Sequence, residues 1–313
     1  LGIDTYTSAS SDKIDPSTIS SASMSDVRIY PSLSWNIENE QKKTNFGIIG
    51  SFSNEFDYTS VGGGVNFSKA SKDNNTEVAL KLQAFLDTWK VILPIELREG
   101  GSAHNELEEH DENNQYSPRN SYSGSFSVSQ VINKRLQALV MVDPTYQQGL
   151  LATKYQRVYF NDNSLKSETL PDNRYKLPIG LRMNYFLGDR IILRSFYRYY
   201  TDSWGIKANT FELETPVKIT PFVSLSPVYR YYQQTKADYF APYAAHQVSE
   251  SYFTSDYDLS KFNSNFMGLG LRLAPPKGVL GWDRLKTMEL RYGHYNRSNG
   301  LNSNIISMNL KFK

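Results

Sequence analysis

Residues 174–200, RYKLPIGLRMNYFLGDRIILRSFYRYY, contain two consecutive stretches in which apolar or aromatic residues alternate with polar or charged ones. In the first stretch, Ile179 and Leu181 are apolar and Arg182 belongs to the other set. A period of two is typical of a β-strand with one apolar and one polar face. The turn residues 187–189 separate the stretches. The segment therefore predicts two neighbouring strands whose arginines point away from an apolar surface.

Residues 205–215 and 223–231 continue this alternation. Soluble sheets alternate as well, but strands of about ten or more residues with tyrosines near their ends are typical of strands that cross a bilayer. We interpret the aromatic residues of 196–200 and 229–232 as interfacial girdle residues. Stacking of sugars or bases on these rings is the alternative.

Thirteen strands of this kind follow from Val27 onward, and residues 1–9 supply a further candidate. The sequence thus predicts an all-β protein with about 14 antiparallel strands, within a range of about 12–16. Three prolines, Pro31, Pro178 and Pro227, lie inside predicted strands. A closed barrel has no free edge to hide a missing N–H group, so we expect β-bulges there.

The connections differ in length on the two sides of the predicted sheet. Segments 91–119, 149–173 and 234–263 follow even-numbered strands, whereas most connections after odd-numbered strands are tight turns and 275–285 is a longer exception. Long loops on one side and short turns on the other are typical of outer-membrane barrels. We expect residues 1–313 to form one transmembrane up-and-down β-barrel with long extracellular loops, short periplasmic turns and both ends in the periplasm.

Composition excludes several other classes of protein. Apolar runs such as Leu139–Val142 are far shorter than the roughly 20 residues of a spanning helix. A formal net charge of +2 gives no electrostatic footprint for nucleic acid. The absence of cysteine excludes disulfides, thiolate metal sites and cysteine nucleophiles. No signal peptide is visible at Leu1, so we expect that an exported form of this sequence is a processed or trimmed chain.

Charged residues gather on the side of the strands opposite to the apolar set. If the apolar side faces lipid, these residues line the lumen, where rings of fixed charge select solutes. Pairing of the same charges across neighbouring strands, which would fill and stiffen the interior, is the alternative. The predicted lumen-lining residues are Lys81, Arg182, Arg194, Arg198, Glu212, Glu214, Arg230, Arg272, Glu289 and Arg291.

Other candidate chemistry is weaker. Residues 104–112, HNELEEHDE, contain the acidic run 106–112 with His104 and His110, which could bind a hard cation or a basic partner. The run lacks the spacing and glycine of a calcium loop, which favours a solvated loop and no metal site. His246 and His294 are the remaining histidines, and Ser298 is the serine nearest to His294 in a possible hydrolase dyad. No nucleophile elbow accompanies them. We expect no catalytic residues and no cofactor.

Several motifs resemble those of one family. They are EFDYTSVGGGVNFS at 55–68, PIELRE at 94–99, KLPIGLRMNYFLGDRIILRSFYRYY at 176–200, YFTSDYDLSKFNSNFMGLGLRL at 252–273 and ELRYGHY at 289–295. Together they resemble an uncharacterised family of predicted outer-membrane β-barrels from Bacteroidota. The resemblance implies an exported barrel in the outer membrane of a Gram-negative bacterium. It supplies no established activity and no catalytic residues.

Two functions fit this reading of the sequence. The first is a passive channel or solute transporter, and the second is a non-catalytic structural or accessory subunit of a larger outer-membrane complex. The expected partners are outer-membrane lipid and lipopolysaccharide, other outer-membrane proteins or lipoproteins, and the barrel-assembly machinery, which recognises a terminal strand such as 306–312. Nucleic acid is not an expected partner.

Overall fold

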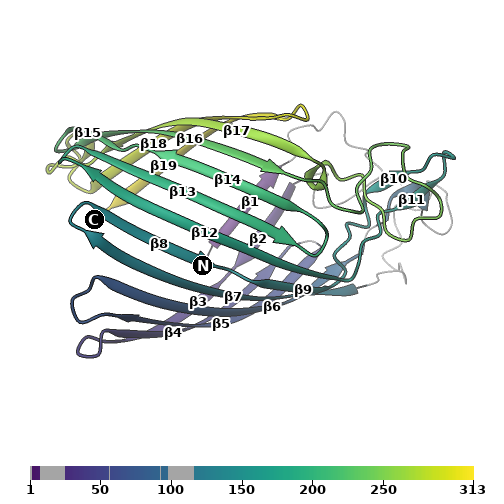
Figure 1. The fold of residues 1–313 in the computed structure, drawn as a ribbon, viewed down its shortest axis with the longest axis horizontal. Helices are drawn as coiled ribbons and strands as arrows, with labels where there is room; N and C mark the ends of the chain where they lie inside the picture. Colours follow the sequence, from purple (N-terminus) through teal and green to yellow (C-terminus); the bar gives the residue numbers. More distant parts are fainter. Residues whose placement is uncertain (1, 8–24, 56, 92, 98–115) are drawn as a thin grey trace.

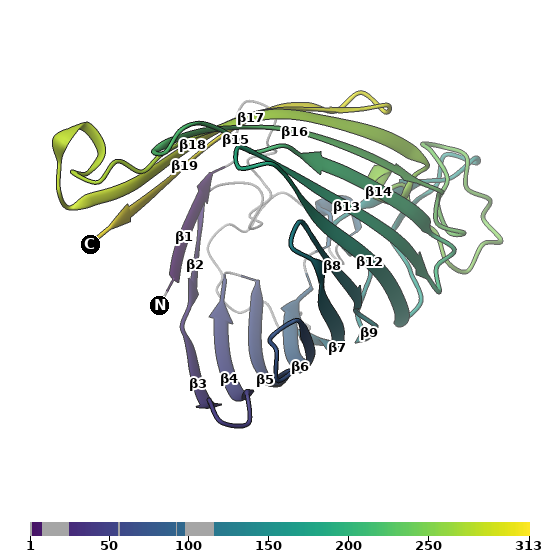
Figure 2. The same cartoon turned by 60° about the vertical axis from the view of Figure 1, so that its left-hand side comes forward.

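The computed structural model describes residues 2–7, 25–55, 57–91, 93–97 and 116–313. Within them, seventeen strand segments form one antiparallel sheet that curves round on itself (Figure 1). These segments are β1 (Gly2–Thr7), β2 (Ser25–Tyr30), β3 (Ser32–Asn39), β4 (Thr44–Asn54), β5 (Tyr58–Ala70), β6 (Thr76–Lys90), β7 (Tyr116–Asn133), β8 (Leu136–Val142), β9 (Thr145–Gly149), β12 (Asn173–Leu187), β13 (Ile191–Asp202), β14 (Lys207–Glu214), β15 (Val217–Thr220), β16 (Val223–Gln234), β17 (Phe262–Leu273), β18 (Leu285–Arg297) and β19 (Asn302–Phe312). Figure 2 shows β3–β9 on one side of the curved sheet and β12–β19 on the other. The prediction of an all-β antiparallel barrel fold is confirmed.

Three strands are each divided into two segments, and the register continues across each division. β2 pairs Ile29 with Asn54 of β4, and β3 pairs Ser32 with Ser51 in the same register. β8 and β9 are likewise two segments of one strand, and so are β14 and β15. In each case both segments keep one register against both neighbouring strands. Counting each divided strand once gives fourteen strands among the described residues, in agreement with the predicted number.

The predicted bulges at Pro31, Pro178 and Pro227 are wrong. Pro178 and Pro227 lie in uninterrupted registers with β13 and β17. Each of the three prolines keeps its carbonyl hydrogen bond, because the amides of Phe52, Asp143 and Thr215 donate to Pro31, Pro178 and Pro227 at 3.0, 3.1 and 2.9 Å. A proline therefore removes one donor from the ladder without displacing a strand. Register shifts occur instead at 131–133, 218–220 and 285–287.

The outward face of the sheet is apolar and exposed. Leu33, Met267 and Ile306 are 80%, 62% and 74% exposed. A continuous apolar surface of this extent is typical of strands that face lipid. No helix in the described ranges is long and apolar enough to span a membrane.

The two ends of the sheet are built differently. Short turns and the 274–284 connection, which contains the 3₁₀ helix η4 (Val279–Gly281), lie at one end together with the carboxyl terminus (Figure 1). Longer connections lie at the other end, where β10 (Arg157–Tyr159) pairs with β11 (Leu165–Ser167) and η3 (Tyr257–Leu259) precedes β17. A third 3₁₀ helix, η2 (Ile95–Leu97), follows β6. β7 already begins at Tyr116, inside the segment 91–119 that the sequence assigns to a loop.

Three of these connections, residues 150–172, 203–206 and 235–261, form what we call the cap. The cap contains most of the fully buried apolar side chains of the described residues, in three clusters. Phe160 is completely buried, and its ring meets that of Phe253 edge-on at a centroid distance of 4.8 Å. The clusters are Leu151, Ala152, Leu170 and Trp204; Val158, Phe160 and Phe253; and Ile206, Ala237 and Phe240.

A buried polar network joins the two long cap connections. The carboxylate of Glu168, only 2% exposed, accepts hydrogen bonds from the Thr153 amide at 2.5 Å and from the Thr254 hydroxyl. The ring nitrogens of His246 lie 2.6 Å from a Glu250 carboxylate oxygen and 2.9 Å from the Thr254 carbonyl. Burial raises the pKa of Glu168, although the bonds from Thr254 and Thr153 oppose the shift.

Replacing Phe160 by Ala should remove about 3–5 kcal/mol of local stability from the cap, because a buried aromatic ring is lost and a cavity remains. Limited proteolysis within residues 150–172 would measure this loss as faster cleavage. The neighbouring Tyr159→Ala is the control, since Tyr159 is only partly buried. Equal cleavage rates for the two variants would contradict a folded core around Phe160.

Replacing Glu168 by Gln should change how cap stability depends on pH. A carboxyl whose pKa is raised in the folded state stabilises the fold in full at pH values below its unfolded pKa of about 4.3. This contribution to stability is lost as the pH rises through the pKa of the folded state. The wild type should therefore lose cap stability between pH 4 and pH 8 relative to Glu168→Gln. Cleavage rates at both pH values, normalised to an unstructured peptide, would test this. Parallel pH profiles of the two proteins would refute it.

Candidate functional site: the charged inner wall

The ten residues predicted to line the lumen lie on one face of the sheet. Directly paired residues of antiparallel strands point to the same side, as do residues two apart on one strand. One row of direct pairs runs from Arg182 through Phe196 and Glu212 to Arg230. The adjoining rows on the same face contain Arg194 with Glu214, Arg198, Arg272 with Glu289, Arg291, and Lys81.

An ion pair identifies this face as the concave one. Arg291 of β18 lies 3.2 Å from Glu214 of β14, although β16 and β17 separate these strands. Adjacent strands lie about 4.8 Å apart, so side chains meet across two intervening strands only where the sheet curves toward them. We call the part of this face on β12–β18 the charged wall. Its residues are Arg182, Arg194, Arg198, Glu212, Glu214, Arg230, Arg272, Glu289 and Arg291.

Three arginines of the charged wall pair with its three glutamates. Glu214 serves two of them, since Arg194 and Arg291 each lie 3.2 Å from its carboxylate. Arg291 also contacts Glu289 on its own strand. Arg230 pairs with Glu212, its direct cross-strand neighbour, at 2.5 Å. Cross-strand pairing, the structural alternative to a solute-selecting role, therefore accounts for part of the wall.

The remaining cations of the set form no ion pair with a described carboxylate. Arg182 lies over the ring of Phe196, with its guanidinium carbon 5.5 Å from the ring centroid. Arg198 pairs in register with Gly180 and Thr210, which carry no charge. Arg272 and, on β6, Lys81 likewise have no partner within ion-pair distance in the described ranges. These four are Arg182, Arg198, Arg272 and Lys81.

The opposite part of the inner face, on β3–β7, is rich in hydroxyl groups and carries few charged residues, namely Glu38, Glu77, Lys81, Asp87 and Arg119. Lys81 lies there between Asn66 and Ser125, its direct neighbours on β5 and β7. Ser125 in turn donates a 2.5 Å hydrogen bond to Asp143. Serine, asparagine and glycine predominate on this side: Ser34, Asn36, Gly47, Ser51, Ser60, Gly62, Gly64, Asn66, Ser121, Ser123, Ser125, Ser127 and Ser129. We call this side the hydroxyl wall.

Sequence reasoning missed an ion pair where the charged wall meets the cap. Arg174 lies 2.5 Å from Asp202, whose side chain is fully buried, and stacks on Trp204 at 4.2 Å from the ring centroid. The Tyr200 hydroxyl donates to the same carboxylate at 2.7 Å. Arg174 and Asp202 belong to the inward set of the alternation, so the period of two contained the signal that places them on this face.

The other sequence candidates are not brought together. Nδ1 of His294 lies 3.0 Å from the Asn304 side chain, and the Ser298 hydroxyl accepts from the Asn263 amide. His246 is buried in the cap network. The acidic run 106–112 lies outside the described residues. Within the described ranges, no group of three or more histidine, aspartate or glutamate side chains has the geometry to hold a metal ion.

Strand alternation divides the aromatic residues that the sequence assigns to a girdle. Tyr197 and Tyr229 are on the outward face and are 44% and 37% exposed. Tyr232 points inward on the row next to Arg230, and its hydroxyl donates to Gln234 at 2.6 Å. Only the odd-numbered residues of 196–200 and 229–232 can therefore belong to an interfacial girdle.

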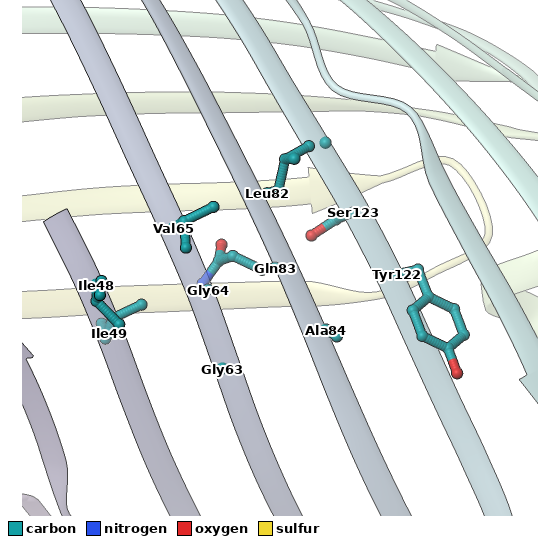
Figure 3. Close-up of a pocket in the computed structure, with 11 residues that line it drawn as sticks. Ile48, Ile49, Gly63, Gly64, Val65, Leu82, Gln83, Ala84, Tyr122 and Ser123 are labelled. Carbon is teal, nitrogen blue, oxygen red and sulfur yellow. The ribbon is translucent and has the colours of Figure 1, made fainter. Parts of the chain in front are cut away.

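A depression of about 640 Å³ lies on the surface of β4–β7 (Figure 3). Its floor is made of small residues such as Gly63 and Ala84, which pair directly with each other. Ile48, Val65 and Leu82 border it, and Tyr122 lies at the β7 side (Figure 3). Most of these side chains belong to the outward set, so the depression is an apolar surface feature outside the charged interior.

Known proteins share the fold at low sequence identity. A ferric enterobactin receptor mutant from Pseudomonas aeruginosa in complex with enterobactin superposes with a TM-score of 0.53 and 11% identity over 87% of this chain and 43% of that one. The siderophore receptor PirA from Acinetobacter baumannii superposes with a TM-score of 0.51 and 8% identity over 92% of this chain and 48% of that one. The chain thus spans less than half the length of these receptors, and the likeness supports the fold alone.

A comparison with curated protein sequences finds no match. The family described as "Protein of unknown function (DUF3570)" matches residues 5–302, which is nearly the whole chain, and the protein therefore belongs to this family.

Proposed function

We propose that the protein is an outer-membrane channel or solute transporter, with the charged wall and the hydroxyl wall lining a hydrated path. One observation carries this proposal. The inward side chains of Arg194, Arg230 and Arg291 are 47%, 52% and 47% exposed, even though each is held in an ion pair. Arginines that merely filled a packed interior would be buried by their neighbours.

The outer-membrane location, in a Gram-negative bacterium, is part of the same proposal. It is supported by the exposed apolar outward face, by the fold shared with the two receptors and by the motif resemblance to barrels from Bacteroidota. Membrane lipid, lipopolysaccharide and the barrel-assembly machinery are the partners that such a location requires. We propose a non-catalytic role, because the candidate His294 and Ser298 bond to different groups.

The cap favours a second candidate function, that of an accessory subunit of a larger outer-membrane complex. Its loops are held by apolar clusters, yet it presents exposed tyrosines, with Tyr243 69%, Tyr257 50% and Tyr252 43% exposed. Tyrosines on a rigid support are frequent anchors in protein interfaces. In this function another protein would cover the cap.

The channel proposal predicts stepwise single-channel conductance from purified, folded protein in a planar bilayer. A Ser127→Trp variant should lower the conductance of each step, because Ser127 lies on the hydroxyl wall. Val128→Trp is the matched control, since the adjacent residue points to the outward face. Heat-modifiable electrophoretic mobility would verify folding of each protein. Absence of steps from folded wild type would refute the channel, as would equal reductions by both tryptophans.

The accessory proposal predicts that the protein leaves the membrane in a larger complex under gentle detergent extraction. The double substitution Tyr243→Ala and Tyr252→Ala should shift native electrophoretic mobility to that of the free barrel, because it removes interface anchors from the cap. Tyr175→Ala is the control, as Tyr175 is 49% exposed but lies on the outward face of β12. A complex that is unaffected by the cap variant would argue against this function.

A further inference from the structure

Two arginines of the charged wall lie next to each other without a carboxylate. Arg182 pairs in register with Phe196, and Arg198 follows two residues later on the same strand as Phe196. The two arginines are therefore diagonal neighbours across β12 and β13, a relation that separates their Cα atoms by about 7–8 Å. Neither has an ion-pair partner among the described carboxylates.

The glutamates of the charged wall do not neutralise this charge, because they pair with other arginines. Arg194, on the other side of Phe196, shares the carboxylate of Glu214 with Arg291, which also pairs with Glu289. Across the whole charged wall there are six arginines and three glutamates. The facing hydroxyl wall adds serine donors, which stabilise anions, and it carries Lys81 and Arg119 as well as the carboxylates of Glu38, Glu77 and Asp87.

Like charges held close together repel each other unless a counter-ion occupies the space between them. Guanidinium groups are permanently charged and present a planar set of N–H donors that fits the two oxygens of a carboxylate or phosphate. The ring of Phe196, which Arg182 covers, keeps that guanidinium in a defined position. Arg182 and Arg198 thus form a site that binds an oxyanion in preference to a water molecule or a cation.

We infer that the path is anion-selective and that Arg182 and Arg198 form its site for small carboxylate- or phosphate-bearing solutes. This inference rests on the proposed channel function, whose substrate class it specifies. The paired arginines, Arg194, Arg230 and Arg291, then contribute a background of positive potential, while Arg182 and Arg198 contact the solute directly.

The test is the zero-current potential of single channels under a tenfold KCl gradient, measured for the wild type and for the Arg182→Gln, Arg198→Gln double variant. Wild type should pass chloride in preference to potassium, and the double variant should lower the chloride-to-potassium permeability ratio at least about twofold. The control variant Lys42→Gln, Lys277→Gln removes the same charge from exposed connections at the carboxyl-terminal end of the sheet and should leave the ratio unchanged. Inorganic phosphate should reduce wild-type chloride current and affect the double variant less.

The outcomes separate the inference from the function on which it rests. A conducting wild type that prefers potassium, or a folded double variant with unchanged selectivity and phosphate block, would overturn the anion site while the channel stands. Silence from folded wild type would remove both. If the glutamine variant does not fold, the Arg182→Lys, Arg198→Lys variant keeps the charge but not the planar donors. It should then retain chloride preference and lose phosphate block, and retention of the full block would refute the oxyanion site.

Discussion

The antiparallel register, which shifts only at strand ends among the described residues, is the constraint on which the rest of the structure depends. In apolar surroundings, each backbone N–H and C=O group must find its partner inside the protein, and a curved sheet supplies these partners between neighbouring strands. The register is retained even at Pro31, Pro178 and Pro227, where one donor is missing but the proline carbonyl still accepts. A bulge would leave an additional residue unpaired and would turn the following side chains to the wrong face.

Register also determines which side chains point into the interior. Because side chains alternate strictly, an apolar outward set forces the intervening residues inward, whatever their charge. Along β17, Met267 and Leu269 point outward while Phe266 and Gly268 point inward. The ring of Phe266 lies where a side chain on Gly293 would be, as a Cβ on that glycine would come within 2.2 Å of it. Arg230 lies over this ring, 5.7 Å from its centroid, so a glycine on one strand helps to position an arginine two strands away.

Much of this arrangement could be predicted from the sequence, because a period of two shows directly which residues share a face of the sheet. The strands around Arg182, Arg194 and Arg230 and their common face are contained in the alternation. The contact between Arg291 and Glu214 is not, since it depends on the curvature of three strand pairs. The cap escaped prediction for another reason. Its buried residues, such as Phe160 and His246, come from loops without periodicity and meet only through long-range contacts.

The position of each inward arginine relative to the cap limits what it can do. Near the cap, Arg174 is held by Asp202 and Trp204, and Arg297 is held by Asp258 at 2.6 Å and stacks on Phe262 at 3.9 Å from the ring centroid. Their side chains are only 13% and 8% exposed, so they anchor loops to strands. Arginines further along the strands keep about half of their surface even when paired. The same residue type therefore serves as structural support beside the cap and as accessible positive charge in the middle of the wall, and burial distinguishes the two roles where sequence pattern cannot.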